Sequence, residues 1–150
     1  MNSVSVVLMV AAGAGIAAQI AVNAHLRTVT GSALWSANIV FVVSVAAGLA
    51  TLAIAGLFST LAAPDPALWR APYWTWLGGL FGAAYVVLAI VLADRLGAAL
   101  VSATGILGQL GASVLIDHYG WFGMPVQRAT PARLIGIGLM LAGVALIRWR

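Results

Sequence analysis

Charged side chains are scarce in this chain of 150 residues: they make up 7% of it, whereas a soluble domain carries about a quarter. Lysine and glutamate are absent, so all seven basic residues are arginines and all three acidic residues are aspartates. Hydrophobic residues make up 63%, and the mean hydropathy is +1.09. Because so few charges cannot solvate a globule of this size, the composition predicts that lipid is the solvent for most of the chain.

Cysteine is also absent, which excludes a disulfide framework, a thiol nucleophile and cysteine metal ligands. The sequence has no metal-ligand spacing, no nucleophile elbow and no phosphate-binding glycine loop. Gly136 and Gly138 stand in an apolar run without the strand that such a loop requires. The arginines form no run that would indicate nucleic-acid binding. We therefore expect no catalytic residue, no metal, no cofactor and no nucleic-acid partner.

Five apolar stretches predict helices at about 4–24, 32–61, 73–93, 96–116 and 134–147. Roughly 20 helical residues suffice to cross a bilayer. The first stretch is interpreted as an uncleaved transmembrane helix rather than a signal peptide. It lacks a basic start, and its apolar run is about twice the usual length. The predicted fold class is therefore all-α: a polytopic transmembrane helix bundle with five spans, forming a single domain over 1–150.

The predicted breaks between these helices are polar or rich in proline. Residues 25–32 are expected to form a short polar turn, and 63–72, with three prolines, an exposed loop. Asp94 and Arg95 are expected to form a very short turn and to neutralise each other at the membrane surface. The longest loop is predicted over 117–133.

Small residues recur four positions apart in the predicted helix 73–93. Gly78 pairs with Gly82, and Gly79 with Ala83. This spacing commonly marks a close contact between membrane helices. We therefore expect another helix to pack against this face.

Three amide side chains lie within the predicted spans. Gln19 and Asn23 are spaced i, i+4, which places them on one face of the first helix, and Gln109 lies in the fourth. Polar side chains in hydrocarbon commonly face the bundle interior, and amides both donate and accept hydrogen bonds, which suits a neutral or zwitterionic solute. Interhelical hydrogen bonding explains any one of them equally well. The three together favour a substrate-binding cavity.

Five further residues are candidates beside these amides. Tyr85 and Trp35 could line the same cavity, with packing as the alternative. Asp117, His118 and Asp94 are candidates for proton coupling or a gate, with a solvated helix end as the alternative. Because an anion is disfavoured at a helix C-terminus, we expect that His118 or an arginine from a loop compensates Asp117, or that the helix has already ended there.

The arginines divide almost evenly between the two sides of the membrane. With five spans, Arg70, Arg128 and Arg133 lie on the side of the N-terminus, and Arg27, Arg95, Arg148 and Arg150 lie on the other. Orientation follows a clear excess of basic residues in cytoplasmic loops, so three against four specifies no preference. We predict dual topology, in which copies insert both ways and pair as an antiparallel homodimer of ten helices.

Several stretches resemble the YdcZ family of small bacterial membrane proteins, within the drug/metabolite transporter superfamily. They are 19–26, 74–82, 95–99, GQL at 108–110, LIDHYGWFGMP at 115–125, and 133–147. The resemblance implies a multi-pass protein of the bacterial inner membrane, equivalent to half of a ten-helix transporter and working as a dimer. It implies no substrate. The related small multidrug resistance exporters use a glutamate in their first helix, and this chain has none, so glutamate-based proton exchange is not carried over.

The sequence thus predicts a transporter that carries small solutes by alternating access at a midplane site between inverted protomers. Its expected partners are the bilayer, a small-molecule substrate and a second copy of the chain. A channel and a non-transporting assembly subunit are the alternatives.

Overall fold

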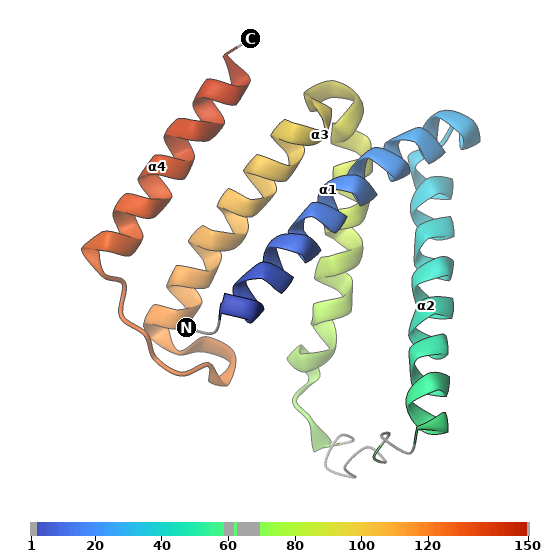
Figure 1. Cartoon of the computed structure of the whole chain (residues 1–150), viewed down its shortest axis with the longest axis horizontal. Coiled ribbons are helices and arrows are strands. Elements are labelled where there is room, and N and C mark those ends of the chain that lie inside the picture. The colour runs from blue at the N-terminus through green and yellow to red at the C-terminus, as the bar shows by residue number, and fades with distance from the viewer. Residues whose placement is uncertain (1–2, 59–61, 63–69, 150) are drawn as a thin grey trace. The chain divides into compact units, whose positions relative to one another are not determined.

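The computed structural model describes residues 3–58, 62 and 70–149, and within these residues all the regular secondary structure is helical (Figure 1). The long helices are α1 (Ser3–Thr30), α2 (Ala33–Leu57), α3 (Leu77–Tyr119) and α4 (Pro131–Arg148), and two short 3₁₀ turns are η2 (Tyr73–Trp76) and η3 (Trp121–Gly123). Four helical stretches in this described part of the chain are long and apolar enough to cross a membrane, with mean hydropathies from 1.6 to 2.4. The prediction of an all-helical membrane protein is confirmed.

Helix α1 is longer than predicted and includes most of the segment expected to form a turn. The hydroxyl of Thr28 donates to the carbonyl of His25 at 2.7 Å, and that of Thr30 to the carbonyl of Leu26 at 3.0 Å, so these polar groups are satisfied by the helix itself. The helix ends at Thr30 and is followed by Gly31, whose φ is 68° and whose N–H donates to the carbonyl of Arg27 at 2.9 Å. A glycine with positive φ is a common helix terminator.

Helix α2 begins at an N-cap, Ser32, whose hydroxyl oxygen accepts the N–H of Trp35 at 3.4 Å. It ends at Leu57, whereas the prediction extended to residue 61. Residues 59–61, and 63–69 of the predicted proline-rich loop, lie outside the described residues. Pro72 precedes the 3₁₀ turn η2, and its carbonyl accepts the N–H of Thr75 at 3.0 Å.

Helix α3 covers most of the third predicted helix, which was expected to begin at residue 73, and all of the fourth, in 43 residues. Its helical dihedrals are interrupted at Gly97, where φ is 75° and ψ is 156°. This region of the Ramachandran plot is accessible almost only to glycine. The break therefore lies at Gly97, just after the turn predicted at Asp94 and Arg95, and separates segments 77–96 and 98–119.

The chain forms two compact units, each described by itself. One comprises Met1–Ile20 and Arg95–Arg150, and the other comprises Ala21–Asp94. In the first unit α4 lies beside the segment of α3 that follows Gly97, the orange part of α3 in Figure 1. The start of α1 belongs to the same unit, whereas its end, α2 and the part of α3 up to Asp94 belong to the other.

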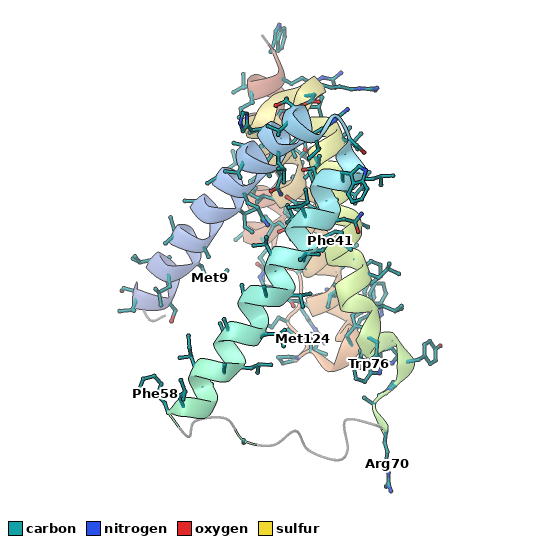
Figure 2. All side chains as sticks on the ribbon, turned by 90° about the vertical axis from the view of Figure 1, so that its right-hand side faces the viewer. Met9, Phe41, Phe58, Arg70, Trp76 and Met124 are labelled. Carbon is teal, nitrogen blue, oxygen red and sulfur yellow. The ribbon has the colours of Figure 1, made fainter. Side chains whose placement is uncertain are left out.

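Few side chains in the described part of the chain are buried. The buried apolar ones are Ile20, Ala37, Ala89, Ile90, Ala93, Val101 and Val114. In the most apolar stretches of the spanning helices, at most 17% of residues are buried. Large side chains such as Met9, Phe58 and Trp76 are exposed (Figure 2). Apolar surface of this extent requires cover by lipid or by a partner.

Candidate functional site

The end of α1 is joined to α3 by an ion pair. Arg27 Nη1 lies 2.9 Å from Asp94 Oδ2, and the same nitrogen donates to the carbonyls of Ile90 and Val91, both at 3.2 Å. The two charged side chains are 31% and 42% exposed, so the pair sits at the edge of the unit. The prediction that Asp94 and Arg95 neutralise each other is therefore wrong. Adjacent helical residues do not face each other, and Arg27 approaches Asp94 from another helix.

Asn23, one turn before Arg27, is buried where α1 meets α2. Its backbone carbonyl accepts the hydroxyl of Ser36 at 3.0 Å, and Ser36 is fully buried. The contact links the two helices across the turn that joins them. The side-chain amide of Asn23 makes no hydrogen bond to any residue that the structure describes, and its predicted role in a cavity stays a prediction.

The two aromatic candidates differ in burial. Trp35 precedes Ser36 in sequence but is 68% exposed, and Tyr85 is half-buried in the first segment of α3. Neither side chain forms a hydrogen bond within the described residues. Their assignment to a substrate cavity stays a prediction.

The end of α3 is linked by an ion pair and hydrogen bonds to the start of α4 and to the loop between them. Asp117 Oδ2 lies 3.4 Å from Arg133 Nη1, and Arg133 Nη2 donates to the side-chain oxygen of Gln127. The backbone carbonyl of Asp117 accepts the N–H of Gln127 at 2.8 Å, and His118 Nδ1 accepts the N–H of Ala129 at 3.1 Å. The compensating charge for Asp117 is thus an arginine, and His118 instead holds the loop backbone.

A pocket of about 340 Å³ lies beside this ion pair. It is lined by Leu110, Ser113, Val114 and Asp117 of α3 and by Arg133 and Gly136 of α4. A carboxylate, a guanidinium and a hydroxyl group thus line one pocket together with apolar side chains. Such a lining suits a small ligand that has a polar group beside an apolar part.

Gln109 is not part of that lining, although the hydroxyl of Ser113 donates to its backbone carbonyl at 2.7 Å. The Gln109 side chain is exposed on the segment 98–119, and Gln19 is half-buried on α1. Neither amide has a hydrogen-bonding partner within the part of the chain that the structure describes. The grouping of these amides around one cavity stays a prediction.

Sequence reasoning missed the hydrogen-bonding roles of Ser36, Arg27 and Gln127. The hydroxyl of Ser36 in an apolar run was a usable signal, because a buried hydroxyl needs an acceptor. Arg27 and Gln127 gave no such signal, since Arg27 lies in the predicted polar turn and Gln127 in the longest predicted loop. Among the described residues no group of three or more histidines and acidic side chains could hold a metal ion.

A family model described as "Putative inner membrane exporter, YdcZ" matches residues 4–146. The match covers nearly the whole of the long helices, including both segments of α3. Comparison with curated proteins and with solved structures gave no match. The family consists of inner-membrane transporters rather than enzymes, and the apolar helices fit that location. The resemblance noted from the sequence is confirmed, and the chain belongs to the YdcZ family of inner membrane exporters.

Proposed function

We propose that the chain carries small polar solutes across the inner membrane by alternating access, as an antiparallel homodimer of five-span protomers. The observation that carries this proposal is the exposed amide of Gln109, without a partner among the described residues, on an apolar helix of an exporter-family chain. In hydrocarbon such an amide requires a partner. A solute or a second copy of the chain would supply it.

The break at Gly97 supports five spans. A continuous helix of 43 residues would be about 65 Å long, roughly twice the hydrocarbon thickness of a bilayer. The segments 77–96 and 98–119 each have about the length of one crossing. The two ion pairs agree with this count. Arg27 and Asp94 fall on one membrane side in a five-span chain, and Asp117 and Arg133 fall together on the other.

The open glycine faces support a second copy. A Cβ atom added at Gly78, Gly79 or Gly82 would meet no atom within 4 Å, so the close helix contact expected there is not made within the described residues. Small-residue faces of this spacing commonly pack against another helix. The near-even division of the arginines favours a copy inserted in the opposite direction.

Topology is tested with single cysteines, since the natural chain has none. Ser3→Cys and Trp149→Cys variants are labelled in intact cells with a membrane-impermeant maleimide. With two orientations, each position is labelled in about half of the molecules. The other half becomes accessible to the reagent only after the cells are lysed. Labelling of one position only, and completely, would exclude the antiparallel dimer.

Transport is tested with the purified chain in liposomes. The solutes are zwitterionic amino acids, neutral sugars and organic cations, each supplied as a radiolabelled probe. Saturable uptake that follows a gradient supports the carrier. Ohmic flux too fast for alternating conformations supports a channel, and no binding or flux with any probe supports an assembly subunit.

A further inference from the structure

A larger pocket, of about 760 Å³, lies at the opposite end of the helix pair formed by the segment 98–119 and α4. Arg95, Leu96 and Leu100 line it from α3, and Ile147 and Arg148 line it from α4. The pocket therefore combines two guanidinium groups with an apolar lining. No part of the candidate site at Asp117 belongs to it.

The two arginines of this pocket carry charge that no described acidic residue compensates. Within the described residues the acidic side chains are Asp94 and Asp117, and they pair with Arg27 and Arg133. Arg95 and Arg148 form no ion pair or side-chain hydrogen bond with any described residue. Two such guanidinium groups at one cavity favour an anion, and their planar donors match the geometry of a phosphate.

Apolar surface continues from Arg148 along α4. A second depression, of about 410 Å³, is lined by Arg148 and Trp149 together with Leu141, Val144 and Ala145. Arg148 thus lines both pockets, and each pocket also has apolar side chains in its lining. An amphiphile with a single anionic head and two hydrocarbon chains has this distribution of polarity.

The position in the membrane agrees with such a ligand. Arg95 and Arg148 lie at helix ends that fall on the same membrane side in the five-span chain, where the phosphate groups of lipids lie. Basic pockets between transmembrane helices bind anionic lipid headgroups. A tryptophan such as Trp149 prefers the same headgroup zone.

We propose that Arg95 and Arg148 bind the phosphate of an anionic phospholipid, whose hydrocarbon chains lie against Leu100 and Ile147 and along α4. The lipid is a resident ligand of the protein and not the transported solute. The site stands independently of the transport mechanism, because it uses none of the residues assigned to the substrate cavity.

The test is lipid retention by the full-length chain in a neutral detergent, measured by native mass spectrometry. Phosphatidylglycerol and phosphatidylcholine are supplied at equal concentration, and the wild type is expected to retain the anionic lipid preferentially. Arg95→Gln and Arg148→Gln should each reduce retention of phosphatidylglycerol about fivefold, and the double variant about 25-fold. Arg128→Gln, which removes an exposed arginine outside the pocket, is the matched control and should change nothing.

Two further measurements distinguish a lipid bound in the pocket from a soluble phosphate bound by the same arginines. Ala99→Phe fills the pocket while both charges remain, and should also reduce retention of phosphatidylglycerol. Millimolar glycerol phosphate should not displace the lipid. Displacement would identify a soluble phosphate as the ligand and overturn the proposal. Equal retention of the two lipids by the wild type would overturn it as well, whether or not the variants fold.

Discussion

Arg27 of α1 joins three groups of α3 through one guanidinium nitrogen: the carboxylate of Asp94 at 2.9 Å and the backbone carbonyls of Ile90 and Val91 at 3.2 Å. The ion pair is partly exposed, and such pairs contribute about 1 kcal/mol or less. The carbonyl bonds depend on Arg27 alone. Arg27 is therefore expected to stabilise this unit more than its acidic partner does.

Arg27→Gln should lower the thermal stability of the purified chain more than Asp94→Asn. The first change removes the ion pair and both carbonyl contacts, which we expect to cost about 1–3 kcal/mol. The second leaves the carbonyl contacts in place and should cost about 1 kcal/mol or less. Melting followed by circular dichroism in detergent provides the comparison, with Arg128→Gln as the control. Equal destabilisation by the two changes would show that the carbonyl bonds contribute nothing.

The sequence was sufficient to predict helices in a membrane, because length and apolar composition alone determine whether a segment can span. It was not sufficient to locate the helix ends. Residues 25–30 look polar, yet Thr28 and Thr30 satisfy their hydroxyls on the preceding turn and α1 continues. The end depends on Gly31 and its positive φ, a backbone property that hydropathy does not report.

The candidate site was predictable only in its residue types. Asp117 was expected to need a positive partner, and Arg133 provides it. Asp94 was expected to use its neighbour in sequence, whereas it pairs with Arg27, which lies on a different helix. Sequence spacing gives the direction of a side chain around its own helix. It does not identify which other helix lies opposite, and that arrangement decides the partner.

Gly97→Ala should destabilise the chain through the backbone alone. The added methyl group would meet no atom within 4 Å, but the residue has a φ of 75° and a ψ of 156°, which side-chain-bearing residues rarely adopt. The expected cost is about 1–3 kcal/mol. Gly13→Ala, in a regular helix and equally free of neighbours, is the matched control and should be neutral or slightly stabilising, because alanine favours the helix. Denaturation of both variants in mixed micelles measures the difference. An unchanged denaturation midpoint for Gly97→Ala would mean that the folded chain does not require a positive φ at residue 97.

Gln109→Leu tests the residue on which the proposed transport site depends. Its amide is exposed and makes no hydrogen bond to the described residues, so the change should leave insertion and the stability of the single protomer intact. Binding of the probe solute that stabilises the wild type most strongly in a thermal-shift screen should weaken about tenfold, as expected for one lost hydrogen bond. Ile106→Leu, on the same helix, is the control. Retained binding would remove Gln109 from the site, and loss of the dimer would identify it as an interhelical contact instead.

His118 should control the order of the loop between α3 and α4 rather than the fold of the helices. Its Nδ1 accepts the N–H of Ala129 at 3.1 Å, one of several contacts that hold this loop, and Asp117 with its bond to Gln127 supplies another. His118→Ala leaves the Ala129 amide without that acceptor, so its hydrogen exchange should accelerate about fivefold to tenfold, as expected for a net loss of about 1 kcal/mol. His118→Asn places a side-chain carbonyl oxygen near the position of Nδ1, and should restore slow exchange.

Mass spectrometry of peptic fragments over 120–130 follows the change, with the interior of α4 as the internal reference. If His118→Ala and His118→Asn exchanged equally fast, the imidazole would have to act through its ring packing on Tyr119, whose centroid lies 4.8 Å away, and not through the hydrogen bond.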